Sequence, residues 1–244
     1  MMFHNGPMPA TGPDVLATHN PANPKERVGA YTPTDPAELH NLVTQARAAQ
    51  RDWLVRPVSE RLELLAKWLD TIASSAEEIA RAITLEQGKP LAEARGETMK
   101  SLTEARQMLA IAAQPLGSVH ATMRGGVTPL SVRRPRGLIV AITPWNFPVL
   151  TPMRKLAPAL AFGNAIILKP SELAPAAACI VARKAEGILP EGLVQIALGG
   201  AALGDALVRS GAEGVTFTGS VPTGRAVFRT ASETLAELSL ELGG

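Results

Sequence analysis

Several short apolar runs in the second half of the chain are followed directly by residues that could do chemistry. The runs LIVAI, AIIL, LVQIAL and GVTF resemble strands that are buried on both faces of a parallel sheet. The segments that follow them are residues 143–148 (TPWNFP), residues 169–172 (KPSE), Gly199-Gly200 and residues 218–220 (TGS), and a last run, LSLEL, carries Glu241. Because the carboxyl ends of parallel strands meet at one edge of a sheet, we expect these segments to surround one ligand.

Two residues of this set could take part in catalysis. Asn146 lies in a loop bounded by prolines, and a side-chain amide on a stiff loop is a preorganised donor for a developing oxyanion. A turn asparagine that satisfies only its own loop is the alternative. Glu241 lies within an apolar run, where an ionised carboxylate is costly, and two glycines follow it that let a substrate approach. We expect Glu241 to act as a general base and the nearby Glu237 to face solvent.

Other residues of the set could hold a dinucleotide. Lys169 and Glu172 could bind the adenosine ribose, and the acidic group suits an unmodified 2′-hydroxyl, although a solvated ion pair is an equal alternative. Ser220 and the amides after Gly219 could hold a pyrophosphate at a helix N-terminus. The common fingerprints are absent: the chain has no GxGxxG, and Arg225 stands where a P-loop needs lysine.

The order of the elements predicts an α/β fold with a doubly wound, mainly parallel Rossmann-like sheet. Helices are expected between the strands, at residues 151–162, 175–188, 201–210 and 222–233. The first part, residues 1–115, is predicted to be an irregular arm up to residue 30 and then a helical segment. Residues 116–135 are predicted to be a β-hairpin or meander, and residues 136–244 the sheet portion.

The composition excludes several classes of protein. Of the 244 residues 46% are hydrophobic and 19% are charged, so disorder is not expected, and a net charge of +2 does not indicate a nucleic-acid surface. The longest uncharged stretch is broken by prolines, so no membrane segment is expected, and without an export signal we expect a cytoplasmic protein. The single cysteine, Cys179, is expected to be a small buried side chain, and no metal site is expected.

Together the motifs resemble the NAD(P)-dependent aldehyde dehydrogenase superfamily. The matching segments are PWNFP, FGNAIILKPSE, FTGS followed by Gly224, LELGG, and LEQGKPLAEARGE (residues 85–97). The resemblance implies that Asn146 donates to the oxyanion and that Glu241 activates water. It also implies a set of cofactor-binding residues: Ile142, Thr143, Pro144, Trp145, Lys169, Ser171, Glu172, Gly204, Phe217, Thr218, Gly219, Ser220 and Leu242.

The implied reaction is the oxidation of an aldehyde or semialdehyde to a carboxylic acid, with NAD as the favoured cofactor and NADP as a possible one. It proceeds by thiolate attack, hydride transfer and thioester hydrolysis. In the family the cysteine lies downstream of LELGG, so we expect this chain to be an N-terminal fragment that lacks it and is inactive alone. Residues 116–135 match the family's oligomerisation hairpin, which implies a homo-oligomer, a dimer or tetramer.

Two alternatives remain open from the sequence. One is a non-catalytic protein that kept the scaffold for dinucleotide binding or oligomerisation. The other is a semialdehyde dehydrogenase that transfers the acyl group to coenzyme A, against which Glu241 argues because its task is to activate water.

Overall fold

A computed structural model of the protein describes residues 15–114 and 117–243. The predicted arm over residues 1–14, the start of the predicted hairpin at residue 116 and the final glycine lie outside the described residues. At the centre is a sheet of five parallel strands with the order β7-β6-β5-β8-β9. The strands are β5 (Leu138–Ile142), β6 (Ala165–Lys169), β7 (Val194–Ile196), β8 (Gly214–Gly219) and β9 (Glu237–Leu242).

The predicted α/β fold with a doubly wound, Rossmann-like sheet is therefore confirmed. The strand order reverses at β5, which pairs with β6 on one side and β8 on the other, and ligands of such sheets bind at this switch point. Every residue of β6 is buried, as its apolar run indicates. By contrast, β9 forms one edge of the sheet, and its side chains alternate between exposed and half-buried.

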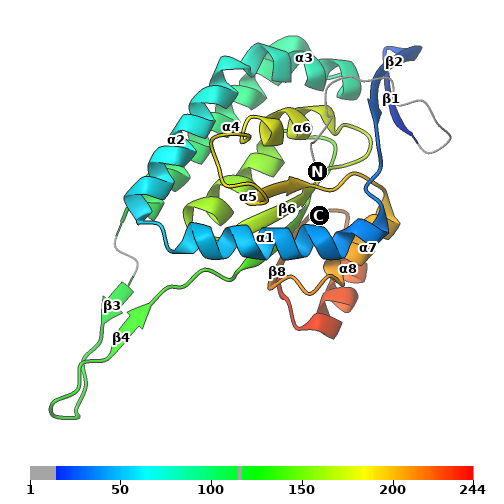
Figure 1. The fold of residues 1–244 in the computed structure, drawn as a ribbon. Coiled ribbons are helices and arrows are strands. Elements are labelled where there is room, and N and C mark those ends of the chain that lie inside the picture. Colours follow the sequence, from blue (N-terminus) through cyan, green and yellow to red (C-terminus); the bar gives the residue numbers. More distant parts are fainter. Residues whose placement is uncertain (1–14, 115–116, 244) are drawn as a thin grey trace.

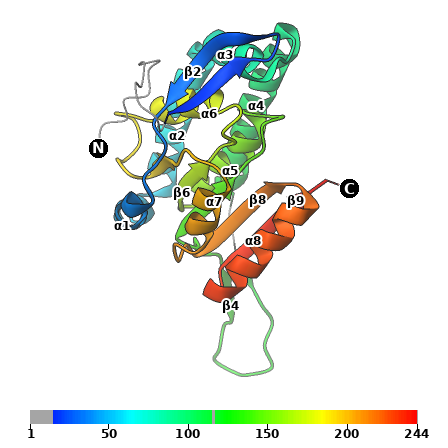
Figure 2. The same cartoon turned by 90° about the vertical axis from the view of Figure 1, so that its right-hand side faces the viewer.

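Four helices connect these strands and pack against the sheet. They are α5 (Leu150–Ala161), α6 (Ala176–Arg183), α7 (Ala201–Val208) and α8 (Val221–Thr234). Figure 2 shows α8 alongside β8 and β9, with which it is in contact. None of the helices in the described ranges combines the length and the apolar character that a bilayer-spanning segment requires.

The helices of the first half of the chain cover this core from outside (Figure 1). They are the short η1 (Pro36–Glu38), α1 (Leu39–Leu54), α2 (Val58–Ser74), α3 (Ala76–Gln87) and α4 (Leu91–Ala112). Two fully buried tryptophans anchor them: the indole of Trp53 donates to the carbonyl of Leu160 at 2.9 Å, and that of Trp68 to the carbonyl of Val181 at 3.1 Å. Buried indoles need such a partner, so both contacts fix the helices in orientation as well as position.

The expectation of an irregular arm up to residue 30 is wrong for the described part. Residues Leu16–Asn20 (β1) and Asn23–Tyr31 (β2) form an antiparallel pair. The side chain of Asn20 closes the turn by accepting from the amide of Ala22 at 3.0 Å. Most of the β2 side chains are exposed, so the strands lack the apolar runs by which the other strands can be recognised.

The hairpin predicted within residues 116–135 is present, as β3 (Gly117–Val119) and β4 (Leu130–Val132). Figure 1 shows that it projects away from the rest of the molecule. All the side chains of these two strands are exposed.

Candidate active site

A cleft of about 520 Å³ lies where the carboxyl ends of β5, β6 and β8 meet α7 and α8. The predicted cofactor-binding residues that line it are Ile142, Thr143, Pro144, Trp145, Lys169, Ser171, Glu172, Gly204, Phe217, Thr218, Gly219 and Ser220. Leu242 is the one predicted cofactor-binding residue that does not line this cleft. Side chains that the sequence did not single out, among them Asp205 and Thr223, also line it. The strand ends thus converge on one site, as the apolar runs predict.

Lys169 and Glu172 lie at one side of this cleft, with 3.5 Å between Nζ and Oε2. They are not a solvated surface pair, because the Lys169 side chain is only 6% exposed while that of Glu172 is 41% exposed. Burial lowers the pKa of Lys169, and the neighbouring carboxylate of Glu172 partly opposes this shift. The arrangement presents a carboxylate to the cleft and a shielded amine behind it.

The N-terminus of α8 lies at another side of the cleft. Ser220 is its N-cap and accepts from the amide of Thr223 at 3.4 Å, while the two hydroxyl oxygens are 2.9 Å apart. Both residues line the cleft. Pro222 has no N–H, and the amides of Thr223 and Gly224 bond to Ser220, so it is the positive end of the helix dipole that favours an anion here. The hydroxyl of Thr143 is also buried and has no hydrogen-bond partner among the described residues.

A second hollow, of about 400 Å³, contains the two predicted catalytic residues. Asn146 and Glu241 both line it, together with Leu242 and Gly243. Its other lining residues, Pro144, Trp145, Thr218 and Gly219, also line the cleft. The hollow and the cleft therefore adjoin along a shared wall.

The surroundings of Glu241 differ from the sequence-based expectation. Its side chain is 56% exposed, because β9 is an edge strand and not a buried one. Nζ of Lys155, on α5, lies 2.5 Å from Oε1 of Glu241, and the Lys155 side chain is only 6% exposed. The hydroxyl of Thr218 donates to Oε2 at 3.5 Å. Sequence reasoning missed Lys155, whose one signal is that it stands with Arg154 as one of two charged residues within the otherwise apolar MRKLAPALA segment.

The family model whose description is "Aldehyde dehydrogenase family" matches residues 8–244. The chain belongs to the aldehyde dehydrogenase family. It is 41% identical over 235 residues to 3,6-anhydro-alpha-L-galactose dehydrogenase from Streptomyces coelicolor, and the match covers 94% of this chain and 47% of that protein. The chain thus spans about half the length of the curated relatives it matches.

Solved structures of aldehyde dehydrogenases share the fold. A 3,6-anhydro-L-galactose dehydrogenase in complex with NAP has a TM-score of 0.89 and 32% identity, over 96% of this chain and 50% of that chain. A point mutant of betaine aldehyde dehydrogenase from Staphylococcus aureus in complex with NAD+ also has a TM-score of 0.89, with 27% identity, over 93% of this chain and 47% of that chain.

Cys179, the single cysteine of this aldehyde dehydrogenase chain, is not part of the site. It lies on α6 and is 5% exposed. It is not among the described residues that line the cleft or the hollow. Burial, and secondarily the charge of Glu86, raises the pKa of its thiol to about 12. A thiol that stays protonated is a poor nucleophile, so the prediction of a small buried side chain is confirmed.

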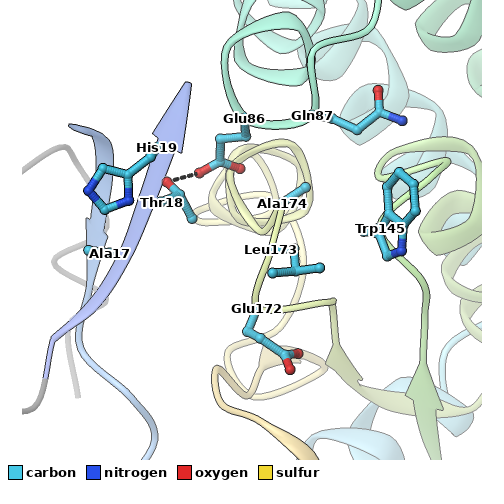
Figure 3. A pocket seen from close by; sticks show the side chains of 9 residues that line it. All are labelled: Ala17, Thr18, His19, Glu86, Gln87, Trp145, Glu172, Leu173 and Ala174. Atoms are coloured by element: carbon cyan, nitrogen blue, oxygen red, sulfur yellow. Dashed lines mark hydrogen bonds between the residues drawn. The ribbon is translucent and has the colours of Figure 1, made fainter. Parts of the chain in front are cut away.

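A third hollow, of about 390 Å³, lies between β1, the end of α3 and the loop after β6 (Figure 3). Glu86 is its buried acid: it accepts from the hydroxyls of Thr18 at 2.7 Å and Tyr31 at 2.6 Å, and from the amide of Ala176 at 2.8 Å. Burial raises the pKa of Glu86, although these three hydrogen bonds oppose the shift. Among residues 15–114 and 117–243, no group of three histidine, cysteine or acidic side chains is arranged to hold a metal ion.

Proposed function

We propose that this chain forms the dinucleotide-binding part of an enzyme that oxidises an aldehyde or semialdehyde to a carboxylic acid with NAD(P)+. One observation carries the proposal: Asn146 and Glu241 line a single hollow that shares a wall with the cleft at the strand ends. An oxyanion donor and a base beside a dinucleotide-sized cleft suit the family's chemistry. In this proposal residues 1–115 and 136–244 build the cofactor-binding part, and residues 116–135 are an oligomerisation hairpin.

The cleft residues fit a dinucleotide. The buried hydroxyl of Thr143, which has no partner among the described residues, could donate to a bound ligand. The positive end of the α8 dipole and the hydroxyl of Ser220 suit a pyrophosphate. Glu172 suits a ribose with a free 2′-hydroxyl, and its charge would repel a 2′-phosphate, so NAD is the favoured cofactor.

The remaining cleft residues have simple roles in this proposal. Lys169 and Ser171 accompany Glu172 at the ribose. A side chain at Gly204 would start within ordinary contact distance of Lys169 and Ile142, so the glycine keeps space open in the cleft. Phe217 and Trp145 provide apolar walls. Leu242 lies in the hollow next to Glu241, on the side where the nicotinamide is expected.

Two residues of the hollow, Asn146 and Glu241, have defined tasks in the proposed reaction. When bound, the nicotinamide supplies a hydride acceptor. The side-chain amide of Asn146 donates a hydrogen bond to the substrate oxygen as negative charge develops on it. The carboxylate of Glu241 accepts a proton from the water that cleaves a thioester, formed on a cysteine other than Cys179, into the free acid and the thiol. Lys155 holds that carboxylate in place. Cys179 takes no part, because its thiol is buried away from the hollow.

A dinucleotide titration tests the proposal. We expect the protein encoded by the complete gene to bind NAD+ in calorimetry, and to bind it more tightly than NADP+. The variant Glu172→Gln should reduce this preference by about tenfold, because it removes the charge that repels the 2′-phosphate. The variant Glu186→Gln, which changes an exposed glutamate just beyond α6, is the matched control. Absence of binding by the wild-type protein would contradict the proposed function.

A further inference from the structure

The segment LEQGKPLAEARGE, residues 85–97, matches the family but lines neither the cleft nor the hollow within the described part of the chain. It runs from the end of α3 into the first turns of α4. Three of its side chains, Gln87, Lys89 and Glu97, are directed at the loop that carries Asn146. The segment therefore contacts the main chain of the site and does not contribute side chains to the described part of its lining.

Gln87 and Lys89 bind the same backbone oxygen. Nε2 of Gln87 donates to the carbonyl of Asn146 at 3.1 Å, and Nζ of Lys89 donates to it at 2.9 Å. Figure 3 shows Gln87 on the same side of the third hollow as Trp145, the residue before Asn146. Two donors on one carbonyl, one of them cationic, restrict the rotation of the peptide plane that follows Asn146.

Glu97 holds the other end of the same loop. Its Oε1 accepts from the amides of Val149 and Leu150, both at 3.1 Å, at the start of α5. Its Oε2 lies 2.5 Å from Nζ of Lys89, and the two side chains are 2% and 11% exposed. This buried ion pair therefore links Lys89, which binds the carbonyl of Asn146, to Glu97, which binds the first amides of α5.

Phe147 adds a contact between these two ends. Nζ of Lys89 lies 4.3 Å from the centre of the Phe147 ring, a cation–π arrangement. The carbonyl of Phe147 accepts from the amide of Thr151 within α5. The main chain from Asn146 to Leu150 is thus held at successive positions, which fixes the point from which the Asn146 side chain extends.

We propose that Gln87 and the Lys89–Glu97 ion pair are positioning residues that fix the Asn146 amide for the developing oxyanion, an inference that rests on the proposed function. They act through the main chain of the loop and touch neither substrate nor cofactor. An oxyanion donor works only at hydrogen-bond distance from the oxygen, and a misplacement of about 1 Å can cost about a hundredfold in rate. The effect belongs to kcat, because the cleft residues that hold the dinucleotide are not displaced.

The test removes the clamp without leaving a buried charge alone. Removing Lys89 by itself would leave Glu97 as an unpaired buried carboxylate and could unfold the protein. The double variant Lys89→Met/Glu97→Gln removes both charges and keeps an oxygen at position 97 for the α5 amides. Gln87→Met is a milder second variant. Arg95→Met is the matched control, because Arg95 lies on α4 near Glu97 in sequence but pairs with Glu77 on α3 and not with the loop.

The measurements are hydrogen–deuterium exchange and steady-state kinetics on the protein encoded by the complete gene. We expect the amides of Val149 and Leu150 to exchange at least about tenfold faster in the double variant, and kcat for aldehyde oxidation to fall by about tenfold or more, with the NAD+ Kd within about twofold. Gln87→Met should also raise the exchange rate and lower kcat, each by a smaller factor. Arg95→Met should change neither the exchange rate nor kcat.

The outcomes separate this inference from the proposed function. Unchanged exchange in both test variants would overturn the inference that the segment positions Asn146. Faster exchange with an unchanged kcat would also overturn it, and so would an equal effect of Arg95→Met. Absence of aldehyde turnover by the wild-type protein contradicts the proposed function, and the exchange comparison still decides whether the segment holds the loop.

Discussion

At the scale of single residues, the contact between Lys155 and Glu241 pairs a buried amine with a half-exposed carboxylate. The amine comes from α5, which begins after the carboxyl end of β5, and the carboxylate comes from the carboxyl end of β9. The two therefore meet at the same edge of the sheet. A carboxylate that is open to solvent on one side and held on the other can reach a water molecule while keeping a fixed position. The carboxylate is thus accessible to water, whereas the apolar sequence of β9 indicates a buried one.

Replacing Glu241 with glutamine tests this role. We expect Glu241→Gln to lower steady-state turnover by about a hundredfold, since the amide cannot take a proton from water, and to leave the NAD+ Kd nearly unchanged. Glu237→Gln is a suitable control, because Glu237 lies on the same strand, is exposed and pairs with Arg136. Turnover of Glu241→Gln within about twofold of wild type would contradict the assignment.

Glu86 makes the stability of the protein depend on pH. Because burial raises its pKa in the folded state, the folded protein binds more protons than the unfolded chain between the ordinary carboxyl pKa and the raised one. Wild type should therefore lose stability relative to Glu86→Gln as pH rises through this window, by at most about 1.4 kcal/mol per pH unit for one proton. Urea unfolding of both proteins from acidic to neutral pH measures the difference, and a difference that grows with pH in favour of wild type would refute it.

At the scale of elements, the buried strands could be predicted because their local sequence reflects their surroundings. Residues Leu138–Ile142 and residues 165–168 are apolar because both faces of these strands are covered. The β1–β2 pair could not be predicted in the same way. Its strands are largely exposed, and what fixes it is the contact of Thr18 and Tyr31 with Glu86, which is more than fifty residues away.

The same distinction applies to the site. Asn146, Lys169 and Ser220 follow apolar runs, so the rule that ligands bind at carboxyl strand ends finds them. Lys155 and Lys89 lie within or before helices, and their partners are distant in the chain: Glu241 is 86 residues from Lys155, and Asn146 is 57 residues from Lys89. Helical periodicity reports only that a face is buried and does not identify a charged partner across the fold.

The turn between α5 and β6 depends on Gly163. Its φ is +88°, and an added Cβ would lie 2.8 Å from Nη1 of Arg61 and 2.9 Å from a ring carbon of Pro135. We expect Gly163→Ala to lower the free energy of unfolding by about 1–3 kcal/mol. Gly96→Ala is the matched control: Gly96 is exposed within α4, an added Cβ meets nothing within 4 Å, and alanine there should stabilise by about 0.5–1 kcal/mol. Urea unfolding measures the free energy of unfolding of both variants, and a change of the same sign in the two would contradict the argument.

At the scale of the whole molecule, the β3–β4 hairpin is the feature that the rest of the fold does not explain. Val119 and Leu130 lie opposite each other, and Val132 follows on the same face of β4, each more than 60% exposed. On the other face, Nε2 of His120 lies 2.6 Å from Oγ of Ser131. A two-stranded hairpin alone is marginally stable in water, so an apolar face on a projecting hairpin favours the proposal that it packs against a second copy of the chain.

Charging this face tests the proposed oligomer. Val119→Lys/Leu130→Glu places opposite charges at a directly paired position, so the hairpin itself keeps a favourable cross-strand contact. Burying the pair in an interface would replace a gain of about 1.5–3 kcal/mol per apolar side chain with a desolvation cost, so association should weaken by at least about tenfold. We expect light scattering to find a dimer or tetramer for wild type and a smaller species for the variant. Val55→Lys, at a valine that is 83% exposed after α1, should leave the mass unchanged. A monomeric wild type, or a variant whose oligomer has the same mass as wild type, would contradict the proposal that a second copy of the chain packs on this apolar face.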